Sequence, residues 1–261
     1  MGINNEFIHV KQKHTENMKK LLLFVLTSLF VGGALFAQTD ESGKVKNEGN
    51  AAWRAKNYKE ALIEFKDDAT VYNVAVCATK LKDYANAEKY FGMSIKNNYK
   101  VASSYLGMAD AQENLKKIPE MLKTLQDGIK ATPGQNVKLE KAYSDYFAKE
   151  GQKFQKANDI AKAAENFTKS SQVSNKQLKA RGLLSLGTLY FNNGASILQK
   201  ATPYATSEKE KYEAEKAKAL ADFKKAQDYL KQAATVEPTN EAVKETQKQV
   251  AEAIAPLVEK K

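Results

Sequence analysis

The sequence predicts an all-α protein built from repeated pairs of helices. Its 261 residues include only 13 glycines and 5 prolines, while alanine, lysine, glutamate and leucine dominate, which is the composition of a helical protein. A spacing of aromatic, small and aromatic residues at Tyr84, Ala87 and Phe91 recurs along the chain. Recurrence at a similar spacing indicates a repeat rather than a lone amphipathic helix.

The chain begins with the features of an export signal. Met18-Lys19-Lys20 precedes 17 mainly apolar residues that end at Ala37, and a charged start, a short apolar core and a small residue describe a secretory signal peptide. We expect residues 18–37 to be this signal, with cleavage near Ala37/Gln38, residues 1–17 to be an upstream extension before the native start, and residues 38–43 to be a flexible N-terminus. An uncleaved anchor is the alternative, although a membrane span needs about 20 apolar residues. The prediction is therefore export to the bacterial periplasm or cell envelope.

Net charge leaves two interpretations open. The chain has a formal net charge of +10, and the part after residue 37 keeps +8. Lysine and glutamate alternate through residues 208–211, which is typical of a solvated helical surface. The positive excess is also a basis for weak association with the envelope through anionic polymers or lipid headgroups. Nucleic acid is not an expected partner, because basic residues and aromatics do not cluster together.

The cysteine and histidine content argues against an enzyme. Cys77 is the only cysteine, and both histidines, His9 and His14, precede the apolar core of the leader. Cleavage would leave no histidine, which removes Ser-His-Asp triads, Cys-His pairs and most zinc sites. We therefore expect no catalytic residue, no metal site and no cofactor, and we expect Cys77 to be a small core residue.

The recurring spacing marks the second helix of each pair. Five triads align on it: Tyr58/Ala61/Phe65, Tyr84/Ala87/Phe91, Ile118/Met121/Leu125, Ile160/Ala163/Phe167 and Phe223/Ala226/Leu230. Their first positions are 26, 34, 42 and 63 residues apart, so the first unit is short and the last carries an insertion. Within the second unit, the helices are expected to break at Lys82-Asp83.

Other positions make the pattern specific. Leu186-Gly187 followed by Tyr190 fits the first helix of a pair, and Pro238 falls eight residues after the last triad position. With these positions, the chain from Asn47 to about Pro238 resembles the tetratricopeptide (TPR) repeat family. The resemblance implies a right-handed α-solenoid of about five helix pairs, in which stacking buries the face that each pair cannot bury alone.

The expected organisation follows from this frame. The array covers residues 44–238, with repeats at about 44–69, 70–101, 102–135, 136–175 and 176–238. Within the fifth repeat, an insertion at about 195–222 is expected to form a long helical hairpin, whose second helix opens with a capping box at Ser207 and Glu210. Residues 239–261 are expected to be a capping helix and tail, which a solenoid needs for solubility.

The resemblance also implies where a partner binds. The first helices of TPR pairs line a concave groove that takes a peptide or a helix of another protein. The residues that the frame places on this face are Lys46, Asn50, Trp53, Arg54, Asn73, Thr79, Lys80, Gln152, Gln155 and Lys156. Trp53, the only tryptophan, is either a binding residue or a packing residue against the N-terminal segment.

One known TPR site fits the sequence only in part. Lys46, Asn50 and Asn73 match positions of the carboxylate clamp found in co-chaperone TPR domains. The other two clamp positions, a lysine and an arginine in the family, fall on Ser103 and Gly107 here. The charge that would hold a C-terminal carboxylate is therefore missing, and the sequence argues against a working clamp.

The sequence thus predicts an exported, non-enzymatic scaffold that binds another protein through the groove or the hairpin. A periplasmic chaperone or assembly factor for outer-membrane or secreted proteins is one alternative, and it would need a more apolar groove. A binder of anionic envelope polymers or lipid headgroups is the other, and its binding would fall as salt rises.

Overall fold

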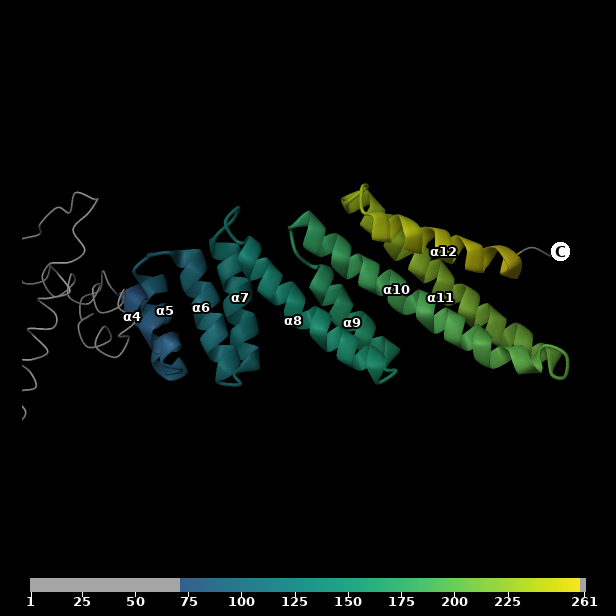
Figure 1. Cartoon of the computed structure of the whole chain (residues 1–261), viewed down its shortest axis with the longest axis horizontal. Coiled ribbons are helices and arrows are strands. Elements are labelled where there is room, and N and C mark those ends of the chain that lie inside the picture. The colour runs from purple at the N-terminus through teal and green to yellow at the C-terminus, as the bar shows by residue number, and fades with distance from the viewer. Residues whose placement is uncertain (1–70, 259–261) are drawn as a thin grey trace, which may run out of the picture. The chain divides into compact units, whose positions relative to one another are not determined.

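The computed structural model describes residues 71–258, and every element in that range is a helix (Figure 1). The helices are α4 (Val71–Lys80), α5 (Tyr84–Lys96), α6 (Val101–Asn114), α7 (Ile118–Ala131), α8 (Val137–Lys156), α9 (Ile160–Ser171), α10 (Lys176–Ala201), the short 3-10 helix η2 (Thr202–Tyr204), α11 (Lys209–Val236) and α12 (Glu241–Val258). The predicted all-α fold is confirmed. The leader and the first predicted repeat, residues 44–69, lie outside the described residues.

Helices that follow one another in the chain pack against one another. α4 packs on α5, α6 on α7, α8 on α9 and α10 on α11, and the second helix of each pair also contacts the first helix of the next. The buried side chains accordingly form local clusters that succeed one another along the chain. This is the arrangement of a stacked helical repeat. The residue numbers at which one repeat passes into the next stay a prediction.

One turn geometry recurs between the helices of a pair. Lys82, Lys116 and Asn158 adopt left-handed backbone conformations, with φ of 60°, 63° and 57°. In each turn the next residue donates its N–H to the carbonyl oxygen five positions back, as Asp83 does to Ala78 at 2.9 Å. This Schellman arrangement satisfies the terminal carbonyls of the first helix. It leaves three residues between the helices and confirms the break predicted at Lys82-Asp83.

Small residues lie where helices cross. Ala87, on α5, and Ala226, on α11, are both 0 % exposed. A Cβ atom added at Gly107 would lie 2.3 Å from the Phe91 ring, and every other described helical glycine except Gly92 would bring an added Cβ within 3.0 Å of a neighbouring atom. The absence of a side chain at these positions therefore sets how closely two helices approach.

The predicted packing residues differ in depth. Ala87, Phe91, Leu186, Gly187 and Ala226 are buried, Tyr84 and Tyr190 are half-buried, and Pro238 is exposed in the turn before α12. The ring of Tyr190 stacks on that of Tyr229 with centroids 5.8 Å apart. Tyr58, Ala61 and Phe65 lie outside the described residues.

α10 and α11 form the long antiparallel hairpin that the insertion predicts (Figure 1). They contain 26 and 28 residues. Their facing sides bury Leu183, Leu186, Phe223 and Leu230, each at most 5 % exposed. The lengthening of both helices therefore adds to a common core.

The capping box predicted at the start of α11 is wrong. Helix α11 begins at Lys209, and the side chain of the preceding Glu208 makes no capping hydrogen bond. The Ser207 hydroxyl donates instead to the Pro203 carbonyl oxygen at 3.5 Å. The reason is that the turn continues through this segment, where the Glu208 N–H donates to the Tyr204 carbonyl oxygen at 2.9 Å.

α12 closes the described end of the array, as predicted for a capping helix. Val243 and Val250 are 0 % exposed and belong to the same core cluster as the hairpin. On the other side of the helix, Lys244 pairs with Glu241 at 2.8 Å. One apolar and one charged face are what the terminal element of a stacked repeat requires.

Cys77 is a core residue, as predicted. Its side chain is 0 % exposed among Val74, Ala75 and Ala78 of the same helix. Burial disfavours the thiolate and raises the pKa of Cys77 to about 11. The thiol is therefore neutral and inert at physiological pH.

Candidate functional site

A groove lies along the first helices of three successive pairs. Its cavity has a volume of about 630 Å³ and is lined by residues of α4, α6 and α8, with α5 and α7 also contributing. Helix α6 supplies Ser103, Leu106, Gly107, Asp110 and Glu113. These positions share one face, because residues three, four and seven apart align along a helix.

The floor of the groove is apolar and firmly packed. Phe91 of α5 and Met121 and Leu125 of α7 line it, with exposures of 4 %, 3 % and 2 %. Phe91 reaches the floor because Gly107 leaves room for its ring. The shape of the floor is therefore fixed by the hydrophobic core and exists before any partner binds.

Helix α6 gives one rim of the groove a negative charge. Asp110 and Glu113 are exposed, and the helix contains no lysine or arginine. Within residues 71–258, no cation forms an ion pair with either carboxylate. Partial burial and then the charge of Glu113 raise the pKa of Asp110. The two carboxylates thus form an uncompensated acidic site in a chain whose net charge is +10.

The opposite rim belongs to α8. Lys138, Asp145, Tyr146 and Lys149 line the cavity there. Burial raises the pKa of Tyr146, and the negative charges of Glu150 and Glu113 raise it further. The hydroxyl of Tyr146 therefore stays protonated and can donate a hydrogen bond into the groove.

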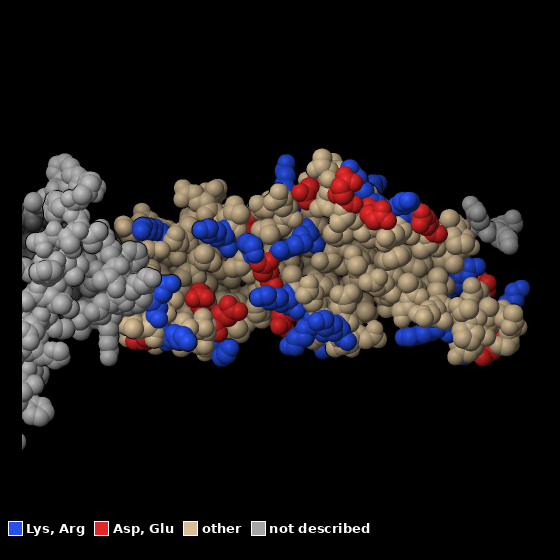
Figure 2. Space-filling view, in the orientation of Figure 1, with Lys and Arg blue, Asp and Glu red and all other residues tan. Residues whose placement is uncertain are grey.

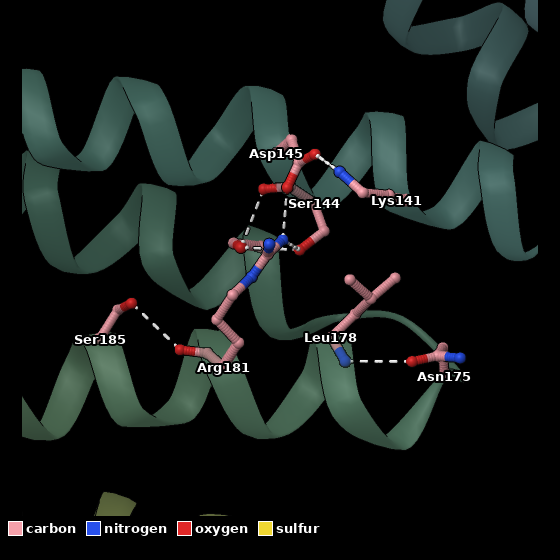
Figure 3. Close-up of polar contacts among 8 residues, drawn as sticks. Lys141, Ser144, Asp145, Asn175, Leu178, Arg181 and Ser185 are labelled. Atoms are coloured by element: carbon pink, nitrogen blue, oxygen red, sulfur yellow. Dashed lines mark hydrogen bonds and ion pairs between the residues drawn. The ribbon is translucent and has the colours of Figure 1, made fainter. Parts of the chain in front are cut away.

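Asp145 is already neutralised by two cations (Figure 3). Its carboxylate lies 2.5 Å from the Lys141 Nζ of its own helix and 2.5 Å from the Arg181 guanidinium of α10. Burial alone would raise the pKa of Asp145, but the hydrogen bonds and charges of Lys141 and Arg181 outweigh it and lower that pKa. The negative character of the groove therefore belongs to the α6 rim.

Arg181 also ties α10 to α8. Its guanidinium donates to the Ser144 Oγ at 3.2 Å as well as to Asp145 (Figure 3). Ser144 in turn hydrogen-bonds Ser170 of α9 at 3.0 Å. This polar cluster joins two successive helix pairs next to the groove, and no local spacing in the sequence links its members.

A second cavity continues the groove toward the beginnings of α6 and α8. Its volume is about 400 Å³, and it shares Ser103, Leu106 and Lys138 with the first cavity. Val137 lines it and is 53 % exposed. The groove therefore has one end where Val137 and Leu106 lie beside Lys138, and an acidic end beside Glu113.

Six of the residues predicted to bind a partner lie in the described range but outside the two cavities. Asn73, Thr79 and Gln155 are half-buried, and Lys80, Gln152 and Lys156 are exposed, on α4 and α8. The Thr79 hydroxyl donates to the Ala75 carbonyl oxygen at 3.0 Å. None of the six lines either cavity, and their role in binding stays a prediction. Lys46, Asn50, Trp53 and Arg54 lie outside the described residues.

The clamp positions of the sequence frame lie on the face of α6 that lines the cavity. Ser103 and Gly107, the two positions that correspond to clamp cations in TPR domains, both line the cavity. Extending the same face by one and two helical turns reaches Asp110 and Glu113. The groove thus carries acidic side chains on the helix where a carboxylate clamp would carry basic ones.

Two further features of the described residues limit the chemistry. Within residues 71–258, no group of three or more His, Cys, Asp or Glu side chains could hold a metal ion. None of the described helices is both long and apolar enough to cross a membrane. On the face in view, Lys and Arg and Asp and Glu lie in small patches with broad areas of other residues between them (Figure 2).

Stacked antiparallel helix pairs with a groove along their first helices define a helical-repeat scaffold. A TPR-repeat protein from Bacteroides fragilis, solved by crystallography at 1.50 Å, matches this chain with a TM-score of 0.75 and 46 % identity, over 83 % of this chain and 100 % of its own. The chain therefore belongs to the TPR repeat family. This fold is suited to protein–protein interaction.

A second solved structure matches only weakly. The TPR2AB domain of yeast Sti1, solved in complex with pHSP90, matches with a TM-score of 0.33 and 16 % identity, over 83 % of this chain and 98 % of its own. No protein-family model matches the sequence. No curated protein matches it either.

Proposed function

We propose that this protein is an exported, non-enzymatic scaffold of the bacterial cell envelope, and that its groove binds an extended segment of another protein. One observation carries the proposal: α4, α6 and α8 together line a cavity of about 630 Å³ that combines an apolar floor with a polar rim. Apolar contacts give affinity in such a site, and a few placed polar groups fix orientation. A rigid floor also lowers the cost of ordering the bound segment.

The non-enzymatic part of the proposal rests on the chemistry of the side chains. Both histidines precede the expected cleavage site. The thiol of Cys77 is buried and its pKa is raised to about 11, so it offers no thiolate nucleophile. Of the carboxylates that line the groove, Asp145 is already paired with Lys141 and Arg181, and Asp110 and Glu113 are exposed at the rim.

Export is tested at the N-terminus of the protein made in cells. Residues 18–37 lie outside the described residues, and the signal proposed there is supported by its sequence. We expect mass spectrometry of the protein from the periplasmic or envelope fraction to give an N-terminal peptide that begins at Gln38, as glutamine or as pyroglutamate. A chain that retains Met18 and stays in the cytosol would contradict the proposal.

Binding in the groove is tested by site-specific photocrosslinking in intact cells. A photoreactive amino acid replaces Ser103, which is exposed and lines both cavities. The matched control carries it at Ala161, which is exposed on α9 and lines neither cavity. We expect a defined adduct from position 103 and none from position 161.

A groove-filling variant provides the second measurement. With the photoreactive group at Lys149, the substitution Ser103→Trp should remove the adduct by occupying the space that a partner needs. The control substitution Ala161→Trp should leave it unchanged. Equal crosslinking with and without Ser103→Trp would contradict groove binding.

The competing surfaces and functions give different results. A version that lacks residues 199–212 tests the hairpin, and loss of the partner in that version alone would place binding there. A chaperone or assembly factor would give adducts of many different masses from position 103. Retention on the envelope that salt removes, with no adduct, would favour an anionic polymer or lipid headgroup.

A further inference from the structure

The two ends of the groove differ in chemistry. The end at the beginnings of α6 and α8 is lined by apolar side chains, including Leu106 and the exposed Val137, together with the polar side chains of Ser103, Gln135 and Lys138. The other end is lined by Asp110 and Glu113. A bound segment therefore meets apolar side chains beside one lysine at the first end and two carboxylates at the other.

The two carboxylates of the acidic end form no ion pair in the described part of the chain, although Lys138 and Lys149 line the same cavity. Asp145 is held by Lys141 and Arg181, whereas in the described part of the chain neither Asp110 nor Glu113 has an ionic partner. Lys149 lines the same cavity without forming an ion pair with either of them. The raised pKa of Asp110, caused by partial burial and then by Glu113, indicates that its charge is poorly compensated. A cation from a partner would supply the missing compensation.

The length of the groove sets the spacing of the segment that fits it. Leu106 and Glu113 are seven residues apart on α6, which is about 10 Å at 1.5 Å per residue. An extended chain covers that distance in roughly three residues, at about 3.3 Å each. Contacts at both ends thus require an apolar and a charged side chain about three residues apart.

We propose that the groove selects a cationic segment of its partner, in which an apolar side chain lies beside Val137 and Leu106 and a lysine or arginine about three residues away lies between Asp110 and Glu113. This inference rests on the proposed groove function and names the chemistry of its ligand. The carboxylates hold the cation through charge-assisted hydrogen bonds. The apolar contacts beside Val137 and Leu106 orient the chain along the groove.

The test uses three synthetic eight-residue peptides with the full-length mature chain. All three carry a leucine, and three residues away they carry lysine, norleucine or glutamate. Each has a fluorophore for anisotropy and a photoreactive group whose attachment site is mapped by mass spectrometry. We expect the lysine peptide to bind about tenfold more tightly than the norleucine peptide, to label groove residues, and to weaken as salt rises.

Matched variants assign the preference to the groove. Asp110→Asn with Glu113→Gln removes two charges, and we expect it to abolish the preference for lysine. Asp228→Asn with Glu252→Gln removes the same charge from exposed positions on α11 and α12 that line neither cavity, and it should leave the preference unchanged. Asp110→Lys with Glu113→Lys should transfer the preference to the glutamate peptide.

The outcomes distinguish a failure of the cationic preference from a failure of groove binding itself. Labelling of the groove by all three peptides with equal affinity would overturn the cationic specificity and leave groove binding intact. Labelling that avoids the groove entirely would overturn both. Equal loss of lysine preference in the groove variant and in the matched control would show that overall charge, and not this site, attracts the peptide. Circular dichroism melting of each variant checks that it is folded.

Discussion

At the scale of single residues, the lack of a side chain at Gly107 shapes the floor of the groove. Gly107 lies against the Phe91 ring, and a Cβ atom there would approach the ring to 2.3 Å. Gly92, on the neighbouring helix, differs because the atom nearest to its added Cβ would be the Met108 Sδ at 3.9 Å. An alanine at position 107 therefore tests the steric contact with Phe91, whereas an alanine at position 92 tests helix propensity without such a contact.

We expect opposite effects of alanine at these two positions. Gly107→Ala should destabilise the protein by about 2 kcal/mol, because the core cannot absorb the methyl group without moving Phe91. Gly92→Ala should stabilise it by up to about 1 kcal/mol, because alanine favours the helix and meets open space. Urea unfolding followed by circular dichroism measures both. Equal effects would show that the contact with Phe91 is not limiting.

The ion pairs of Asp145 predict a pH dependence. The folded-state pKa of Asp145 is lowered, so the stability it contributes is present above its unfolded-state pKa and is lost as pH falls through the folded-state value. Asp145→Asn should therefore cost about 1 kcal/mol at neutral pH. The cost should shrink below about pH 4, where the unfolded carboxylate protonates.

The comparison uses unfolding free energies of both proteins from neutral to acidic pH. Asp228→Asn, at an exposed position of α11, is the control and should change stability little at any pH in that range. A cost for Asp145→Asn that stays constant with pH would mean that packing, and not charge, explains its role.

Residue-level prediction from the sequence was accurate where geometry is local. Ala87 and Phe91 were identified because a small residue and an aromatic at fixed spacing are required where helices cross, and both are buried. Arg181 and Asp145 are 36 residues apart, so no local spacing rule links them. Asp110 was within reach, since it continues the face that holds Ser103, but without a structure nothing distinguished a groove charge from a solvated one.

At the scale of elements, the recurring turn contains a residue that is poorly suited to it. Lys82 has φ of 60°, and a left-handed conformation costs a non-glycine residue about 1 kcal/mol. Lys82→Gly should therefore stabilise the α4–α5 pair by about 0.5 kcal/mol after the greater freedom of the unfolded chain is subtracted.

The matched control for this prediction is Lys224→Gly. Lys224 is exposed in the middle of α11, where glycine should cost about 1 kcal/mol. Thermal unfolding of both variants measures the contrast. Destabilisation by both would mean that the Lys82 side chain stabilises the turn in another way.

Elements were predicted better than their ends. The long hairpin followed from one apolar stripe through Tyr212, Phe223 and Leu230, which tertiary packing enforces. The start of α11 did not follow from Ser207, because a capping box needs suitable backbone geometry as well as the residue pattern. The turn that begins at Tyr204 keeps the chain non-helical past Ser207.

On the scale of the described array, each pair depends on its neighbours. α12 packs on α11 and shares a core cluster with the hairpin through Val243 and Val250. In such stacks, stability is approximately a sum of terms for single repeats and their interfaces. Removal of a terminal element should therefore act first on the adjacent pair.

A chain that ends at Thr239 tests this expectation. We expect hydrogen exchange to accelerate at least tenfold in α10 and α11, because their interface with α12 becomes exposed. Exchange in α6 and α7 should stay close to that of the full-length chain. A uniform acceleration in all helices would instead indicate one cooperative unit.

The turn between α10 and α11 is also a suitable place to insert an affinity tag. Ala205, Thr206 and Ser207 are exposed there, and none of them lines the groove cavities. An affinity tag at the beginning of the chain would be discarded with the proposed signal peptide. A short tag inserted between Ala205 and Thr206 would stay with the exported protein, so that captured complexes could be purified through the hairpin while the groove stays free.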